Sequence, residues 1–171
     1  IAKGGIALSN ENYGLIYGTA GTIAFILGSI LSGYYISHFG LKKTLFSLVC
    51  IFNIPFAVYL LLAIFQPSNL WWIGTGIVFE YFSYGFGFVG ITLFMMQQIA
   101  PGKYQMAHYA FANSLMNLSV MVPGMLSGKL ATAFGYQTFF IIVLLVTLPA
   151  IIMAIRLPFA HAVEAKTSDA K

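Results

Sequence analysis

Glu80 is the one acidic side chain inside a long apolar stretch of this sequence. It follows Leu70 by ten residues, so a helix that begins at Leu70 carries the carboxyl about 15 Å along its axis. That distance is about half the thickness of the hydrocarbon core of a membrane. A carboxyl at such depth is costly unless it is protonated, paired or hydrated. We therefore take Glu80 as a candidate for proton or substrate coupling; the alternative is a protonated acid that ties helices together by hydrogen bonds.

Two amide side chains, Asn113 and Asn117, stand four residues apart in a later apolar stretch. Residues at this spacing share one face of a helix. They are therefore candidates to bind the polar groups of a substrate in a membrane cavity, and Tyr84 is a third candidate for the wall of that cavity. The alternative is that the amides bond to a neighbouring helix.

Glycines form a second group of candidates. Gly85, Gly87 and Gly90 have the G-x-G-x-x-G spacing of dinucleotide sites, but both flanks are apolar here, whereas that site needs a strand before it. Close helix packing or a flexible gate is the better explanation. A proline within a helix lacks a backbone donor and is expected to bend the helix. The residues assigned to packing or gating are Gly85, Gly87, Gly90, Pro123, Gly124 and Gly128.

The residue pattern does not indicate an enzyme, a metal site or a cofactor. The histidines lie far apart without ligand spacing, and the single cysteine, Cys50, cannot form a cysteine-based metal site. The sequence contains neither a G-x-S-x-G nor an H-E-x-x-H motif. We expect no metal, no cofactor and no catalytic residue.

The elements that must position these residues are membrane spans. Only 7% of the 171 residues are charged, against about 25% in soluble domains, and 60% are hydrophobic. The apolar runs are long enough to cross a membrane, and short connections with glycine or proline separate them. The predicted fold class is an all-α polytopic membrane protein with five transmembrane helices. Their expected ranges are 13–36, 44–65, 70–99, 106–130 and 139–157.

Lysines and arginines orient these spans, because cytoplasmic loops carry an excess of both. One side of the predicted bundle receives six of the eight cationic residues, and the net charge of +4 indicates membrane orientation rather than nucleic-acid binding. This side is cytoplasmic and includes the C-terminus. The expected domains are an outer loop at 1–12, a five-helix bundle at 13–158 and a cytoplasmic tail at 159–171. The odd number of spans predicts that an N-terminal portion is missing.

The five spans differ in their content of small and polar residues. The first, third and fourth are rich in glycine, whereas the second and fifth contain none. Small residues let helices approach closely, and polar residues in a membrane need a partner or a watery cavity. We therefore expect the first, third and fourth spans to lie in the interior and the other two at the lipid-facing periphery.

A short motif recurs with opposite membrane orientation. Leu31-Ser32-Gly33, five residues and Phe39-Gly40 reappear 95 residues later as Leu126-Ser127-Gly128, five residues and Phe134-Gly135. The first copy ends a span that runs inward, and the second ends a span that runs outward. This arrangement is typical of the inverted repeats of secondary transporters.

The first copy continues into a motif that resembles the loop of the major facilitator superfamily, G-x-x-x-D-R-x-G-R-R/K. Gly33, Gly40, Lys42 and Lys43 match it. Ser37 and His38 replace the Asp and Arg, so this sequence departs from the pattern at the two residues that make the usual charge interactions of the loop. The resemblance implies that the spans are helices 8–12 of a twelve-helix core whose N-terminal half and seventh helix are missing.

A narrower resemblance covers nearly the whole chain. The segments 13–21, Phe79-Glu80 with Gly85-Phe86-Gly87, and Pro123-Gly124 look like AmpG-type muropeptide permeases of the peptide–acetyl-coenzyme A transporter family. This resemblance implies proton-driven import of anhydromuropeptides across the bacterial inner membrane. The implied partners are the lipid bilayer, a small-molecule substrate, protons and the missing N-terminal half. The alternatives are a permease for a sugar or small peptide and, in other classes, a channel or a membrane-embedded enzyme.

Overall fold

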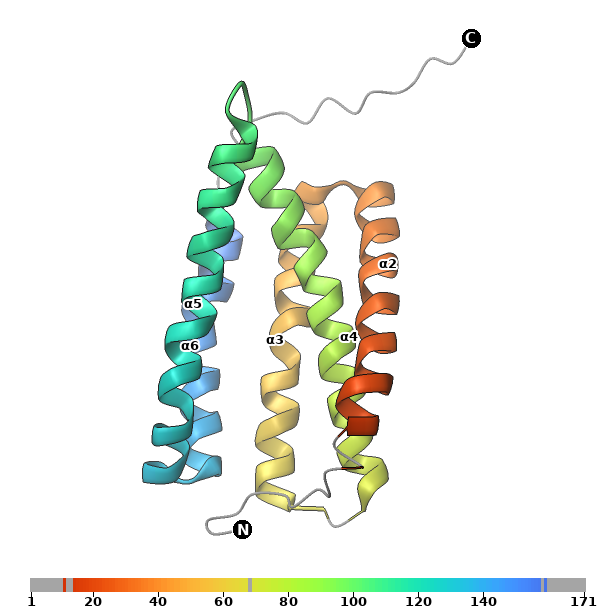
Figure 1. The fold of residues 1–171 in the computed structure, drawn as a ribbon, viewed down its shortest axis with the longest axis vertical. Coiled ribbons are helices and arrows are strands. Elements are labelled where there is room, and N and C mark those ends of the chain that lie inside the picture. Colours follow the sequence, from red (N-terminus) through yellow and green to blue (C-terminus); the bar gives the residue numbers. More distant parts are fainter. Residues whose placement is uncertain (1–10, 12–13, 68, 158, 160–171) are drawn as a thin grey trace.

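The computed structural model of the chain describes residues 11, 14–67, 69–157 and 159, and helices account for nearly all of them. Figure 1 shows long helices arranged side by side, and no strand occurs within the described ranges. The predicted all-α fold class is confirmed. The predicted outer loop and tail lie almost entirely outside the described residues. The elements in order are η1 (Gly14–Gly21), α2 (Thr22–Phe39), α3 (Leu41–Phe65), α4 (Leu70–Phe94), η2 (Met95–Ile99), α5 (Gln105–Phe134) and α6 (Tyr136–Arg156).

Two of these elements are π-helical segments that extend longer helices. η1 runs directly into α2, and η2 continues α4 to Ile99. A π-helical turn widens the backbone and shifts the side chains that follow it, and such turns are frequent at functional sites. Tyr17 lies in η1.

Two helical connections are much shorter than expected. α2 continues to Phe39 rather than Ile36, and α3 already begins at Leu41, so Gly40 alone makes the turn. Its φ of +80° lies in a region that suits glycine. Gly135, with φ of +79°, makes the same one-residue turn between α5 and α6. The connections are shorter than the predicted loops because a single glycine with positive φ is enough to reverse the chain direction.

These two turns also have the same hydrogen bonds, which extends the sequence repeat to the backbone. The Gly40 N–H donates to the Ile36 carbonyl at 2.8 Å, and the Gly135 N–H donates to the Ala131 carbonyl at 3.0 Å. Each glycine carbonyl in turn accepts from the first turn of the next helix, at 3.3 Å from Thr44 and 3.0 Å from Phe139. The motif therefore encodes one structural unit twice.

Four helices of the described chain are long and apolar enough to cross a membrane: Gly14–Phe39, Leu41–Phe65, Leu70–Ile99 and Tyr136–Arg156. The fifth expected span forms as α5, a helix of 30 residues that is ample in length. It differs in composition, because Gln105, His108, Asn113, Asn117 and Lys129 interrupt its apolar surface. α5 is therefore the most polar helix of the bundle.

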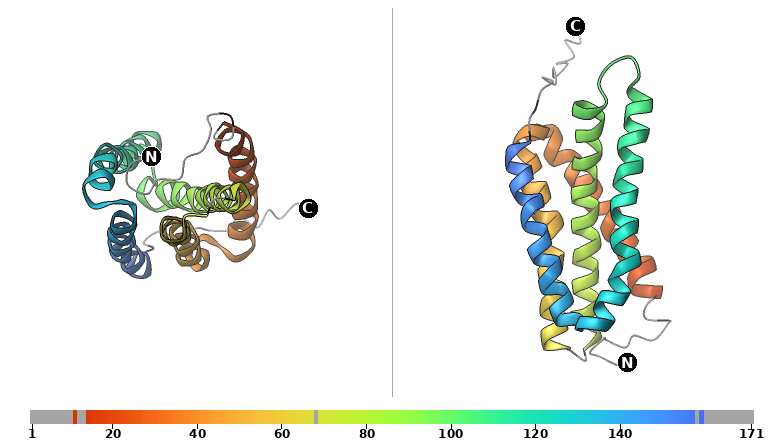
Figure 2. Two further views of the ribbon diagram at one scale, coloured as in Figure 1. Left: turned by 90° about the horizontal axis from the view of Figure 1, so that it is seen from below. Right: turned by 90° about the vertical axis from the view of Figure 1, so that its left-hand side faces the viewer.

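α4 lies between α2 and α3, and α6 packs against α3 (Figure 2). The prediction of a peripheral second span was wrong within this chain, because α3 contacts α2, α4 and α6. α3, which contains no glycine, supplies bulky side chains that fill the gaps beside the glycines of α4. Phe52 lies against Gly87, and Leu48 lies against Gly90. The fifth span, α6, has no buried residue among those described, in keeping with a peripheral position.

α5 differs from its expected interior position. It packs on α6 and η2, and it has no close backbone contact with α2, α3 or the main part of α4 in the described chain. Ala131 is its one buried residue there. Most of the α5 surface is therefore left uncovered by the described residues.

Candidate functional site

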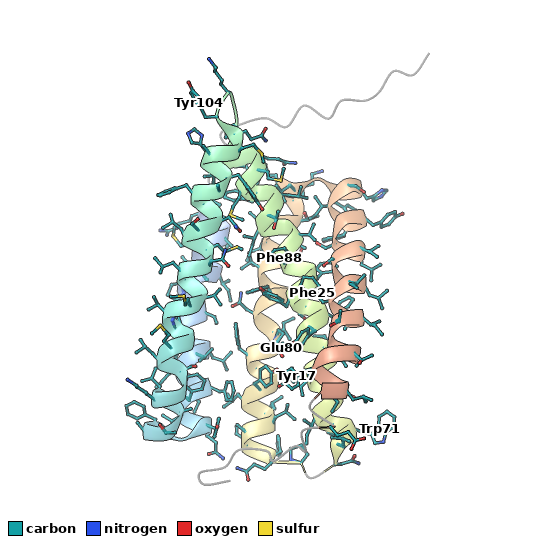
Figure 3. The ribbon with its side chains drawn as sticks, in the orientation of Figure 1. Tyr17, Phe25, Trp71, Glu80, Phe88 and Tyr104 are labelled. Atoms are coloured by element: carbon teal, nitrogen blue, oxygen red, sulfur yellow. The ribbon has the colours of Figure 1, made fainter. Side chains whose placement is uncertain are left out.

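The site is centred on a hydrogen bond between α3 and α4. The Tyr59 hydroxyl on α3 donates to the Glu80 carboxylate on α4, and both residues are half-buried. Figure 3 shows Glu80 part-way along α4, between Phe88 and Trp71. The predicted intramembrane acid therefore has a partner from another helix.

Aromatic rings from two further elements surround this pair. The Tyr59 ring stacks on Phe140 of α6, with 5.6 Å between ring centroids and 15° between planes. The Tyr59 hydroxyl also interacts with Tyr17 of η1. Tyr17 in turn meets Tyr81 edge to face at 5.9 Å. Tyr59 thus connects α3, α4, α6 and η1 around one carboxylate.

We did not predict Tyr17, Tyr59 or Phe140 as site residues from the sequence. One signal for Tyr59 was present: it is the single hydroxyl-bearing residue in the stretch 54–65. A lone phenol in such a stretch needs a hydrogen-bond partner when buried, and the lone intramembrane acid is an obvious one. Tyr17 and Phe140 carried no comparable signal, because tyrosine and phenylalanine are common throughout this chain.

Tyr84 lies one helical turn beyond Glu80 and belongs to an aromatic cluster. Its ring contacts Phe25 of α2 and Phe52 of α3, each at 5.6 Å, and Phe88 at 6.1 Å. The Tyr84 side chain is 43% exposed, so part of its ring is open. The structure thus brings Tyr84 near Glu80 in an aromatic wall built from three helices.

The glycines of α4 sit where neighbouring helices approach most closely. A Cβ atom on Gly85 would lie closer than 3.0 Å to the Phe25 carbonyl oxygen, and one on Gly28 equally close to the Phe82 carbonyl oxygen. Gly87 and Gly90 meet Phe52 and Leu48 of α3 in the same way. The α4 glycines therefore allow α2 and α3 to pack directly against the backbone of the helix that carries Glu80.

The packing candidates outside α4 have a different environment. A Cβ atom on Gly33, Gly124 or Gly128 would meet no atom within 4 Å in the described chain. Pro123 lies inside α5, which continues as a helix through it. No packing role is visible for these residues among the helices described.

Asn113 and Asn117 are not brought close to Glu80 in this chain. The Asn117 side-chain amide donates to the Asn113 backbone carbonyl at 2.8 Å, within α5. Asn117 is exposed, and Asn113 is half-buried. Because α5 does not pack on the main part of α4 here, the two amides and the carboxylate stand on separate helices without contact.

The loop-motif residues lie at the α2–α3 turn, and their contacts are local. The Ser37 hydroxyl donates to the Tyr34 carbonyl at 2.8 Å, and the His38 ring packs on Tyr34 and Phe39. Lys42 and Lys43 are exposed in the first turn of α3. A helix N-terminus disfavours cations, so the two lysines do not stabilise this helix and another requirement must account for them.

No cluster of three or more potential metal ligands occurs among the described residues. Glu80, the one acid among the described residues of the membrane spans, accepts a hydrogen bond from Tyr59. The charged Glu80 carboxylate accepts a hydrogen bond from Tyr59, whereas the protonated carboxyl also has an O–H that must donate to some acceptor. Because its hydrogen bonding differs between the two states, Glu80 is suited to binding and releasing a proton.

Comparison with known proteins agrees with this description. Residues 4–171 match the profile of the Major Facilitator Superfamily. A protein of Rickettsia felis named "Putative transporter AmpG 1" is 25% identical over 142 residues, which cover 80% of this chain and 31% of the relative. The protein of the same name from Rickettsia conorii is 23% identical over 143 residues, covering 80% of this chain and 32% of the relative.

An uncharacterised protein of Haemophilus influenzae is 24% identical over 153 residues, covering 86% of this chain and 36% of the relative. No solved structure matches the chain. The chain spans about a third of the length of these curated relatives. The profile covers nearly the whole chain. The chain therefore belongs to the major facilitator superfamily, a family of membrane transporters.

Proposed function

We propose that this chain is the C-terminal half of a proton-coupled transporter that imports anhydromuropeptides across the bacterial inner membrane. The C-terminus lies in the cytoplasm in this proposal, and Lys42 and Lys43 keep the α2–α3 turn on the same side. The N-terminal half completes the translocation path. The observation that carries the proposal is the Glu80–Tyr59 hydrogen bond within the apolar bundle.

Glu80 is the coupling residue, because its hydrogen bonding changes with protonation. The charged carboxylate only accepts hydrogen bonds and suits the Tyr59 hydroxyl, whereas the neutral acid also has a proton to donate. Tyr59 touches Phe140 of α6 and interacts with Tyr17 of η1. A change in the Glu80–Tyr59 bond therefore acts on several helices at once, as rocking of one half against the other requires.

The substrate contacts the exposed side of Tyr84 and the amides of Asn113 and Asn117. The aromatic wall around Tyr84 supplies apolar surface for sugar rings, and the two amides supply hydrogen bonds for sugar or peptide groups. Closing the path brings α5 toward α4. Gly85, Gly87 and Gly90 permit helix movement at this point, and Pro123, Gly124 and Gly128 permit bending of α5.

The identity of the substrate rests on the resemblance to AmpG-type permeases and on the names of the Rickettsia relatives. A permease for another sugar or small peptide is the second candidate, because an aromatic wall beside amides and a carboxylate suits those solutes as well. The two candidates differ only in which solute competes for the same site.

The test is uptake of labelled anhydromuropeptide by the full-length protein, with and without a protonophore. We expect accumulation that the protonophore abolishes, and an excess of free sugar or unrelated peptide should not compete. Accumulation of a sugar or peptide instead would favour the second candidate. Flux that only equilibrates the solute, unaffected by the protonophore, would indicate a channel and contradict the proposal.

A further inference from the structure

Two cations lie at the same end of two helices that pack against each other. α3 begins at this end with Lys42 in its first turn, and α6 ends there with Arg156 in its last turn. Leu157 packs on the buried cluster that contains Leu41 and Leu45, so the end of α6 is level with the start of α3. Figure 2 shows the blue end of α6 beside the orange turn from which α3 begins. Both cationic side chains are exposed, and they can therefore approach the same ligand.

No described acid neutralises these two cations. The acids among the described residues are Glu11 and Glu80. Glu80 lies inside the bundle and accepts from Tyr59, whereas Glu11 lies just before η1, at the opposite end of the bundle. A cation in the first turn of a helix also opposes the helix dipole, so Lys42 disfavours α3 unless an anion is near. This end of the bundle therefore carries positive charge that an external anion can neutralise.

An apolar cavity opens just inside this end, among α3, α4 and α6. Its volume is about 340 Å³, within the range of about 300–1,000 Å³ that is usual for small-molecule sites. The lining runs from Leu45 and Leu157 near the end of the bundle to Asn53 and Ala150 deeper inside, and no described lining residue is charged. Met153 also lines the cavity and is 62% exposed, so the cavity is open along α6. Such a cavity suits an apolar chain rather than a polar solute.

Helix geometry places the two cations at the rim of this cavity. On α3, Val49 and Asn53 of the cavity wall follow Lys42 by 7 and 11 residues, which is close to two and three full helical turns. Lys42 therefore lies on the cavity-facing stripe of α3. On α6, Arg156 follows Met153 by three residues, so these two side chains are neighbours on the helix surface.

The depth of the cavity corresponds to one leaflet of a membrane. Between Lys42 and Asn53, α3 rises about 16 Å at about 1.5 Å per residue. Half of the hydrocarbon core is about 15 Å thick. Cations at the rim and an apolar cavity below them therefore match the headgroup and the acyl chain of a phospholipid. Basic pockets between membrane helices are established binding sites for anionic headgroups.

We propose that Lys42 and Arg156 bind the phosphate of an anionic phospholipid whose acyl chain occupies the α3–α4–α6 cavity. Both side chains form charge-assisted hydrogen bonds with phosphate, and their long apolar stems lie along apolar surface while the charge stays in the headgroup region. α6 has no buried residue among those described, so lipid reaches it from the side. The leaflet is the cytoplasmic one in the proposed orientation, whereas the binding itself depends neither on the proposed substrate nor on proton coupling.

Lys43 is a matched control for the charge of Lys42. It is rotated by about 100° around the helix relative to its neighbour. It lies one turn before Ser47, whose hydroxyl is hydrogen-bonded to the Tyr35 hydroxyl of α2 at 3.2 Å. Lys43 therefore lies on the side of α3 toward α2, away from the cavity. Lys43→Gln and Lys42→Gln remove the same charge from the same helical turn, so a difference between them reports position.

Val146 is a matched control for the cavity wall. Val146 and Ala150 are both exposed on α6, one turn apart, but only Ala150 lines the cavity. Ala150→Phe fills the cavity and leaves both cations in place, whereas Val146→Phe adds a ring outside it. This pair of variants therefore tests the acyl-chain site without changing the charge of the protein.

The test is native mass spectrometry of the purified full-length protein in detergent, titrated with phosphatidylglycerol or with phosphatidylcholine of the same acyl chains. We expect the unaltered protein to bind phosphatidylglycerol about tenfold or more tightly than phosphatidylcholine. Lys42→Gln and Arg156→Gln should each weaken phosphatidylglycerol binding by about fivefold, the contribution of one cation near an anionic lipid. Lys43→Gln should leave it unchanged. Ala150→Phe should weaken binding of both lipids, and Val146→Phe of neither.

Three results would overturn the proposal. Equal affinity of the unaltered protein for the two lipids would show that the headgroup is not recognised. Equal weakening by Lys42→Gln and Lys43→Gln would indicate diffuse attraction to positive charge rather than a site. Unchanged binding in Ala150→Phe, or no bound lipid at all, would show that no acyl chain occupies the cavity. None of these results bears on proton-driven uptake, which tests the proposed function separately.

Discussion

Replacing Gly28 by alanine is the sharpest test of how the helix carrying Glu80 is held. A Cβ atom at this position would lie closer than 3.0 Å to the Phe82 carbonyl oxygen, whereas ordinary contact begins near 3.4 Å. A backbone oxygen cannot rotate away as a flexible side chain does. α2 and α4 must therefore move apart over their whole contact, which also disturbs the matching site at Gly85.

The expected cost follows from this geometry. Overpacking in a dense interior costs about 1–3 kcal/mol, and a clash with backbone belongs at the upper end. The shift in melting temperature per kcal/mol falls as a protein gets longer, from about 2–4 °C at 150–250 residues to about 1 °C at three times the length of this chain, so Gly28→Ala should lower the melting temperature of the full-length protein by about 3 °C.

Gly33→Ala is the control, because it lies in the same helix and its Cβ would meet nothing within 4 Å. The assay is thermal unfolding of the purified full-length protein in detergent, followed by the loss of the monodisperse species. Gly33→Ala should unfold at or slightly above the temperature of the unaltered protein, since alanine favours helix. Equal melting temperatures for the two variants would refute the close approach of α2 and α4.

Three further predictions concern the site and the turns. Tyr59→Phe keeps the ring stacked on Phe140 but removes the donor to Glu80; proton-driven uptake should fall about tenfold at unchanged expression, and a normal rate would rule out the pair as the coupling site. Gly40→Ala and Gly135→Ala place a side chain at φ near +80°, and each should cost about 1–3 kcal/mol in thermal unfolding; an unchanged melting temperature would contradict the one-residue turns. Replacing Lys42 and Lys43 together by glutamate should impair correct insertion of the α2–α3 turn, measured by the accessibility of a cysteine introduced at Ser37, and unchanged cytoplasmic labelling would argue against their role.

Much of the fold was predictable because membrane helices carry a strong local signal. Long apolar runs predicted five helices, and all five form. The helix ends were less predictable. Phe39 and Leu41 are helical although they flank a glycine, because one residue with positive φ suffices to reverse the chain. The repeat at Gly135 has the same geometry. The repeated motif therefore predicted the positions of the two turns, although the helix ends beside them were not predicted correctly.

The relative positions of the helices were harder to predict, because they depend on contacts between distant residues. The lack of glycine in 44–65 suggested a peripheral helix. In the structure, however, large side chains of this helix, α3, pack against the glycines of α4. α5 was expected inside because of its polar residues, yet none of the described helices packs over most of it. Composition indicates which helix surfaces must be covered, but it does not indicate which helix covers them.

The candidate site likewise contains one residue that was predictable from the sequence and others that were not. Glu80 was evident because an acid in an apolar run is rare and costly. Its partner Tyr59 lies 21 residues earlier on another helix, and only the folded chain brings the two together.

The most direct test of the account is substrate exchange by Glu80→Gln in the full-length protein, reconstituted in vesicles. Glutamine resembles the protonated acid in shape and lack of charge, but it cannot release a proton. We expect this variant to lose accumulation driven by a proton gradient yet still to exchange labelled for unlabelled anhydromuropeptide across the membrane. Gradient-driven accumulation at the rate of the unaltered protein would contradict the assignment of Glu80 as the coupling residue.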